Sequence, residues 1–129
     1  MPQVKCRILY VDDHEDSSEM VKLLFSESDY EVHTASSMDG ALRLAGTHAF
    51  DLYVLDKHLP DGSGFELCAK LNQLTPGVPC IFYTGDAYEI HRQEALAAGA
   101  DAYIPKPDVE KLIETVQQMV SERECATTG

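Results

Sequence analysis

Short apolar runs alternate with longer polar-apolar segments along the whole chain. The runs are three to six residues long and rich in Val, Ile, Leu, Tyr and Phe, which indicates β-strands. The run at 52–55 is apolar throughout, as expected of a strand buried on both faces, whereas 30–35 alternates as an edge strand does. The predicted strands are 6–11, 30–35, 52–55, 78–83 and 102–104.

Each predicted strand is followed by a segment in which apolar residues recur at the i, i+3 and i+4 spacing of one helix face. The clearest stripe begins after Asp108, which can cap the helix, and consists of Val109, Leu112, Ile113, Val116 and Val120. Ser36 or Ser37 can cap the second helix, and Gly99 closes the fourth. The predicted helices are 14–27, 38–46, 65–73, 86–98 and 109–120.

Five repeats of strand and helix joined by short connections predict an α/β fold. Such alternation favours a five-stranded parallel sheet, doubly wound with helices on both faces, in the strand order 2-1-3-4-5. The length of 129 residues fits a single domain over 1–129. We expect its core to cover about 4–120, with a polar tail over 121–129.

The charge and the cysteine content of the chain argue against several classes of function. The formal net charge is −12, which argues against direct nucleic acid binding because phosphate contacts need clustered Lys and Arg. The four cysteines form no C-x-x-C pair and suggest neither a zinc site nor a disulfide framework. Because the chain has no signal peptide and no apolar run long enough to cross a membrane, we expect a cytoplasmic protein without membrane contact.

Four of the predicted strands end in polar residues. Asp12 and Asp13 follow the first strand, Asp56 the third, Thr84 the fourth and Lys106 the fifth. In a parallel sheet these residues meet at one edge, where converging carboxylates favour a hard divalent cation such as Mg²⁺. Carboxylates, a cation, a lysine and a hydroxyl together suit a phosphoryl group, for which a carboxylate can be the nucleophile.

These residues, each at the end of its own strand, are the motifs of a known family. The sequence resembles the receiver domain of two-component response regulators, with a flavodoxin-like or CheY-like fold, over about 4–120. The resemblance is carried by the acidic pair Asp12-Asp13, by Asp56 with its loop 59–62 (Leu-Pro-Asp-Gly), by Thr84 and by Lys106-Pro107.

The resemblance implies a phosphorylation site. Asp56 is expected to accept a phosphoryl group from a histidine kinase, a phosphotransfer protein or a small donor such as acetyl phosphate. Asp13, Asp56 and the backbone carbonyl of His58 are expected to ligate Mg²⁺ or Mn²⁺, and Asp12 to act through a bound water. Such a domain is not an enzyme towards other substrates and catalyses only its own phosphorylation and dephosphorylation.

The resemblance also implies a switch. Lys106 is expected to pair with one phosphoryl oxygen while Thr84 moves to another, and Tyr103 then turns inward. The bond before Pro107 is expected to be cis. The face formed by 86–98, 102–104 and 109–120 would change and bind a downstream partner, a fused effector domain or a second copy of the chain.

Two other classes of protein remain as alternatives. A binding module that works without phosphorylation would have lost acceptor or metal residues, which this chain keeps. A Mg²⁺-dependent phosphohydrolase would place an aspartate two residues after the nucleophile, where this chain has His58. Lys57 departs from the family pattern, and we expect its side chain to point away from the site. His14, which follows the acidic pair, can either reach the phosphoryl group or be a solvated residue at a helix start, and we expect the second.

Overall fold

The computed structural model describes residues 6–26, 30–85, 89–106 and 108–123. Its strands and helices alternate as the sequence predicts, with one addition, a short hairpin after the third strand. The strands are β1 (Cys6–Val11), β2 (Tyr30–Ala35), β3 (Leu52–Leu55), β4 (His58–Leu59), β5 (Gly62–Ser63), β6 (Cys80–Thr84) and β7 (Ala102–Pro105). The helices are α1 (Glu15–Ser26), α2 (Met38–Thr47), α3 (Gly64–Leu74), α4 (Glu89–Ala97) and α5 (Val109–Arg123).

A five-stranded sheet in the order β2-β1-β3-β6-β7 forms the centre of the molecule. All four of its strand pairs are parallel. The predicted order 2-1-3-4-5 is confirmed, since β6 and β7 are the fourth and fifth strands once the separate β4–β5 hairpin is set aside. The chain adds β2 on one side of β1 and the later strands on the other side, beginning with β3. The carboxyl ends of the parallel strands β1 and β3 are therefore neighbours.

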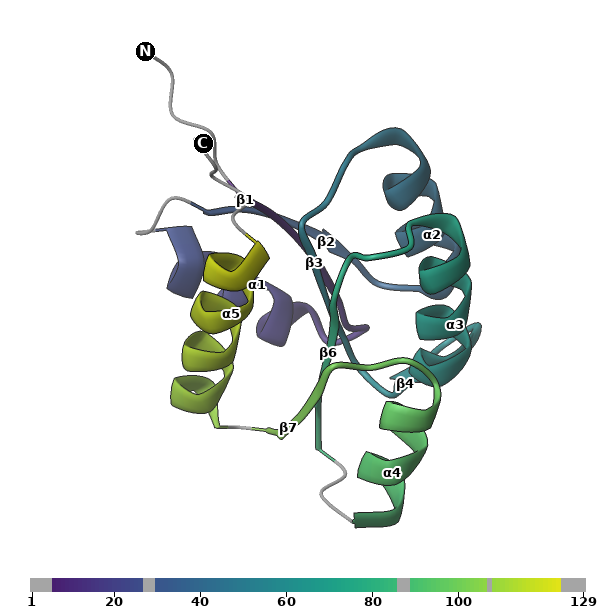
Figure 1. Cartoon of the computed structure of the whole chain (residues 1–129). Helices are drawn as coiled ribbons and strands as arrows, with labels where there is room; N and C mark the ends of the chain where they lie inside the picture. The colour runs from purple at the N-terminus through teal and green to yellow at the C-terminus, as the bar shows by residue number, and fades with distance from the viewer. Residues whose placement is uncertain (1–5, 27–29, 86–88, 107, 124–129) are drawn as a thin grey trace.

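Helices cover both faces of the sheet, as Figure 1 shows, with α1 and α5 on one side and α2, α3 and α4 on the other. Because side chains alternate along a strand, each strand contributes to two cores. Leu9, Tyr53 and Phe82 pack beneath α2 and α3, while Ile8, Val54 and Ile81 pack beneath α1 and α5. This two-sided burial is why the strands are nearly continuous apolar runs.

The β4–β5 hairpin, where the sequence predicted only a loop, ties the segment after β3 to α2. Its two strands pair antiparallel, His58 with Ser63 and Leu59 with Gly62. At its turn, the Asp61 carboxylate accepts hydrogen bonds from the backbone N–H groups of Met38 and Asp39, at 2.7 and 3.0 Å. Backbone N–H groups at a helix start lack partners within the helix, so this contact fixes the loop against α2.

Element boundaries differ from the predicted ones where proline intervenes. The fourth strand begins at Cys80 rather than at 78, because Pro79 has no N–H to donate to a sheet, although its carbonyl still accepts from the Tyr53 N–H at 3.0 Å. Predicted caps are confirmed. Ser37 accepts from the Gly40 N–H, and Asp108 from the Lys111 N–H. Gly99 closes α4 with a φ of 107°.

Three of the four cysteines lie in the described part of the chain. Cys68 and Cys80 are free and buried, as expected of small core residues, whereas Cys6 is disulfide-bonded, contrary to the expectation from its spacing. In the described part of the chain, none of the helices has the length and apolar character needed to cross a membrane.

Candidate functional site

The residues that follow β1 and β3 lie side by side at the carboxyl edge of the sheet. Asp12 and Asp56 are only 1% and 6% exposed. The Asp12 N–H donates to the Ala35 carbonyl at 3.1 Å, and the Asp56 N–H to the Val11 carbonyl at 2.9 Å. These bonds extend the sheet ladder one residue past each strand, so the backbone holds both carboxylates in place.

Lys106 joins the two carboxylates. Its Nζ donates to Asp12 Oδ2 at 2.6 Å and to Asp56 Oδ2 at 3.2 Å, and its side chain is 19% exposed. Its backbone N–H donates to the Thr84 carbonyl at 2.8 Å, which places the lysine against the end of β6. The predicted residues Asp12, Asp56, Thr84 and Lys106 therefore lie at one edge.

Charge pairing and burial shift the pKa values of this group in opposite ways. Burial alone raises the pKa of Asp12, but hydrogen bonds from Lys106, the His14 N–H and Tyr10 bring it below its ordinary value. Burial alone lowers the pKa of Lys106, but the bond to Asp12 and the charge of Asp56 raise it above its ordinary value. Asp12 is therefore a carboxylate and Lys106 an ammonium at neutral pH.

Two neighbours of Asp12 complete its hydrogen bonding. The Tyr10 hydroxyl donates to Asp12 Oδ2 at 2.8 Å, and burial, followed by the charge of Asp12, raises the pKa of that phenol. The backbone N–H of His14 donates to Asp12 Oδ1 at 2.9 Å, and its ring Nδ1 lies 3.0 Å from the same oxygen. Both residues are two positions from Asp12, a spacing that could have identified them from the sequence.

The carboxylates form a group that suits a metal ion. Asp12, Asp13, His14 and Asp56 each offer one ligand atom, and these atoms all lie within 4.8 Å of one another. Asp13 is exposed, whereas Asp12 and Asp56 are buried. Three carboxylates, one of them open to solvent, match the preference of Mg²⁺ for hard oxygen ligands and several retained waters, so the donor set fits this ion.

The loop after Asp56 folds back closely on that residue. The His58 N–H lies 3.3 Å from Asp56 Oδ1, and the Gly64 N–H donates to the Lys57 carbonyl at 2.7 Å. The Lys57 ammonium lies 5.8 Å from the centre of the Phe65 ring, so this residue contacts α3.

Aromatic rings connect the site to β7. Phe82, on β6, lies 5.3 Å from Phe65 and 6.3 Å from Tyr103 between ring centroids, and it is stacked on Tyr103 at 27°. Tyr103 is partly buried and Thr84 is buried. Pro107, for which the sequence predicts a cis bond, lies outside the described residues.

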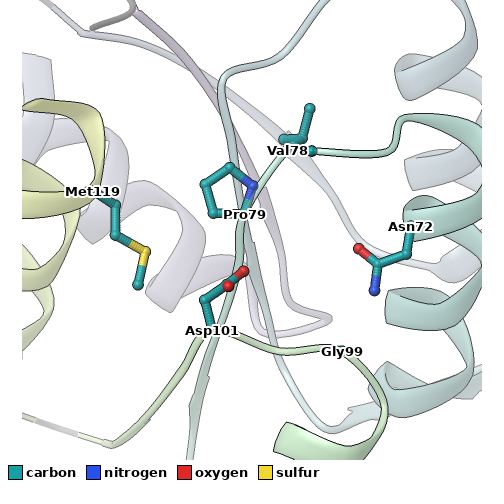
Figure 2. A pocket seen from close by; sticks show the side chains of 7 residues that line it. Asn72, Val78, Pro79, Gly99, Asp101 and Met119 are labelled. Atoms are coloured by element: carbon teal, nitrogen blue, oxygen red, sulfur yellow. The ribbon is translucent and has the colours of Figure 1, made fainter. Parts of the chain in front are cut away.

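A separate cavity lies at the opposite edge of the sheet. It has a volume of about 400 Å³ and is lined by Asn72, Gly77, Val78, Pro79, Gly99, Asp101 and Met119. Figure 2 shows Asn72 from α3, Asp101 from the segment before β7 and Met119 from α5 around it. Because Pro79 and Asp101 precede β6 and β7, this cavity is at the amino ends of the strands and is not part of the acidic group.

Comparisons with known proteins assign the chain to a family. A family model, the response regulator receiver domain, matches residues 8–117. Among solved structures, a response regulator receiver domain protein (CheY-like) from Methanospirillum hungatei JF-1 is similar, with a TM-score of 0.87 and 36% identity over 93% of this chain and 97% of that chain. This chain belongs to the response regulator receiver domains, which are signalling domains of two-component systems.

Two relatives among curated proteins agree with this assignment. The alkaline phosphatase synthesis transcriptional regulatory protein PhoP of Bacillus subtilis (strain 168) is 38% identical over 101 residues, which are 78% of this chain and 42% of that protein. The response regulator ArlR of Staphylococcus aureus (strain Mu50) is 31% identical over 115 residues, 88% of this chain and 52% of that protein. The chain thus spans about half the length of these relatives.

Proposed function

We propose that this receiver domain is a phosphorylation-controlled switch in which Asp56 accepts the phosphoryl group. The observation that carries this proposal is the buried Asp56 carboxylate, held 3.2 Å from the Lys106 ammonium beside the acidic residues that suit Mg²⁺. A carboxylate in such a setting is a nucleophile, and the surrounding cations neutralise phosphoryl charge.

The transfer step follows from these positions. A carboxylate oxygen of Asp56 attacks the phosphorus of a phosphohistidine on a histidine kinase or phosphotransfer protein. The phosphorus–nitrogen bond breaks, the histidine leaves with the electron pair, and an acyl phosphate forms on Asp56. Lys106, which contacts Asp56 Oδ2, is positioned to pair with a phosphoryl oxygen.

Asp13, Asp56 and the backbone carbonyl of His58 would hold Mg²⁺ or Mn²⁺, and Asp12 would act through a bound water. The fit of the donor set supports this assignment, because Asp12 is already occupied by Tyr10, His14 and Lys106 whereas Asp13 is exposed. The ion supplies charge neutralisation for the incoming phosphoryl group.

The signal would leave the site through Thr84 and Tyr103. Thr84 would move to a phosphoryl oxygen, and Tyr103, stacked on Phe82, would turn inward and shift the face made by α4, β7 and α5. This face would bind a downstream partner or a second copy of the chain.

A fused effector domain is another possible carrier of the output, since the transcriptional regulator PhoP is about twice the length of this chain. The net charge of −12 supports an output through protein contacts rather than direct nucleic acid binding.

Intact-mass spectrometry after incubation with acetyl phosphate tests this proposal. We expect one phosphoryl adduct on the wild-type chain in the presence of Mg²⁺, and none when EDTA replaces Mg²⁺ or when Asp56→Asn removes the acceptor. The matched control is Asp39→Asn, because Asp39 is exposed on α2 and pairs with Arg43, away from the acidic group. The control should be phosphorylated like the wild type.

Absence of an adduct on the wild-type chain, with acetyl phosphate and also with phosphoramidate, would overturn the proposal. The chain would then be better described as a binding module that works without phosphorylation. An adduct that persists in Asp56→Asn would place the acceptor elsewhere.

A further inference from the structure

The cavity at the amino ends of the strands combines one charged group with apolar walls. Its volume of about 400 Å³ lies within the range of small-ligand sites. Among the described residues that line it, Asp101 is the only charged one. Val78, Pro79 and Met119 provide apolar surface. In Figure 2, Met119 reaches in from α5 on the side opposite Asn72. The walls therefore suit a ligand with an apolar part and a group that pairs with a carboxylate.

Backbone contacts hold the Asp101 carboxylate at this place. The Asp101 N–H donates to the Cys80 carbonyl at 2.8 Å, and Asp101 Oδ2 accepts the Cys80 N–H at 3.0 Å. Its other oxygen, Oδ1, accepts no hydrogen bond from the part of the chain that the structure describes. One oxygen thus fixes the side chain, and the second is left to accept a hydrogen bond from a ligand.

The amide of Asn72 supplies a second oxygen. Its Nδ2 lies 3.5 Å from the Ala98 carbonyl oxygen and 3.9 Å from Cys68 Sγ, and these contacts orient the amide. Gly99 makes room for it, because a Cβ at Gly99 would overlap Nδ2. In Figure 2 the Asn72 oxygen is on the side of the amide that faces Asp101. Two oxygen acceptors on fixed side chains therefore face the cavity, one from α3 and one from the start of β7.

We propose that this cavity binds a small organic ammonium ion. The ammonium group has three hydrogen-bond donors and no acceptor, which matches the oxygens of Asp101 and Asn72, and its charge matches the carboxylate. The hydrocarbon part of the ligand gains free energy by leaving water for the apolar walls. The net charge of −12 favours the approach of a cation and opposes that of an anion.

This site is independent of the proposed phosphorylation. The cavity is at the amino ends of the strands, whereas Asp56 and Lys106 lie at the carboxyl edge. An organic cation is also attracted to the acidic group there, so the binding measurement is made in saturating Mg²⁺, which competes for that group. Failure of ammonium binding would leave the phosphorylation proposal untouched, and the reverse holds as well.

Titration of the isotope-labelled full chain with pentylammonium, followed by NMR at neutral pH, tests the inference. Pentylamine is protonated under these conditions, as a lysine side chain is. We expect saturable shifts of the backbone amide signals of Gly77, Gly99 and Asp101. The uncharged n-pentanol and the anion pentanoate, which carry similar hydrocarbon chains, should bind at least about fivefold more weakly.

Two variants separate the charged from the apolar part of the site. Asp101→Asn keeps an oxygen for the Cys80 N–H and removes the charge. It should weaken pentylammonium binding by about fivefold, the upper end for an ion pair open to solvent, and leave n-pentanol binding unchanged. Met119→Ala should weaken the binding of both ligands by a similar factor, because both lose the same apolar contact. Asp39→Asn, the matched control, removes one negative charge from the exposed surface of α2 and should bind like the wild type.

Three results would overturn the inference. The first is the absence of saturable binding to the wild-type chain, or shifts confined to residues around Asp12 and Asp56. The second is an Asp101→Asn variant that binds pentylammonium as tightly as the wild type. The third is an equal loss in Asp101→Asn and Asp39→Asn, which would show a general effect of surface charge rather than a site.

Discussion

At the scale of single residues, two buried tyrosines differ in the partner of their hydroxyl. Tyr10 and Tyr83 are each 1% exposed. The Tyr10 hydroxyl donates to Asp12, whereas the Tyr83 hydroxyl is buried with no hydrogen-bond partner among the described residues. A buried polar group without a partner loses its hydration and gains nothing in return, so the two hydroxyls should affect stability in opposite directions.

Removing each hydroxyl tests this contrast. Tyr83→Phe should raise the free energy of unfolding by about 1 kcal/mol, because it removes an unpaired buried hydroxyl and keeps the ring. Tyr10→Phe should lower it by about 1–3 kcal/mol, because Asp12 then loses a hydrogen bond in a buried site. Urea denaturation of both variants gives the two values, and a loss of stability in Tyr83→Phe would contradict the assignment of an unpaired hydroxyl.

At the scale of elements, the start of α3 lies directly against the chain segment that carries Asp56. Gly64 is the first residue of α3 and is buried. A Cβ at Gly64 would overlap the backbone oxygen of Asp56 and lie 2.8 Å from Phe82 Cε1. Glycine is required at this position because the helix and the loop approach each other too closely for any side chain.

Two glycine substitutions measure this close approach. Gly64→Ala should lower the free energy of unfolding by about 2–3 kcal/mol, because the helix and the Asp56 loop must move apart. Gly46→Ala, in the exposed end of α2 where a Cβ meets nothing within 4 Å, should raise it by about 0.5–1 kcal/mol through the entropy of the unfolded chain. Thermal or urea unfolding compares them, and a Gly64→Ala variant as stable as the wild type would show that the loop yields easily.

At the scale of the whole molecule, Lys106 connects three strands of the main sheet. It follows β7 and contacts Asp12, which follows β1, and Asp56, which follows β3. The lysine is 94 residues from Asp12 and 50 from Asp56. Because these contacts exist only in the folded chain, the protonation of the pair is linked to the stability of the whole fold.

The pH dependence of stability follows from the directions of the two pKa shifts. Folding lowers the pKa of Asp12 from its ordinary 3.8, so its stabilisation is full above that value and is lost as the pH falls through the folded pKa. Folding raises the pKa of Lys106 from its ordinary 10.5, so its stabilisation is full below that value and is lost as the pH rises through the folded pKa.

We therefore expect the contribution of this pair to be constant from about pH 4 to pH 10 and to fall on both sides. Urea denaturation in EDTA across this range measures it. Asp12→Asn should have a shallower loss of stability on the acid side than the wild type. An unchanged acid slope in that variant would show that Asp12 does not respond to folding in the direction described.

The sequence by itself determined the elements and the edge of the sheet at which the chemistry lies. Apolar runs identified the strands of the main sheet, and strict alternation with helices required that sheet to be parallel, so Asp12, Asp56, Thr84 and Lys106 had to meet at its carboxyl edge. The chain order of these residues was enough to indicate the family. The spacing of apolar residues carries this information because the buried positions recur with the period of the strand or helix that contains them.

Only the tertiary structure decided which atoms meet at that edge. No local pattern reveals that Lys106 donates to Asp12 at 2.6 Å, because the two residues are far apart in the sequence. The hairpin after Asp56 was missed because its strands are two residues long and are held by the contact of Asp61, in the turn, with the first residue of α2. The sequence favoured a solvated His14 over one that reaches the site, and its contact with both acidic residues depends on where α1 starts relative to the end of β1. Distances between side chains from different elements follow from packing, which periodicity does not encode.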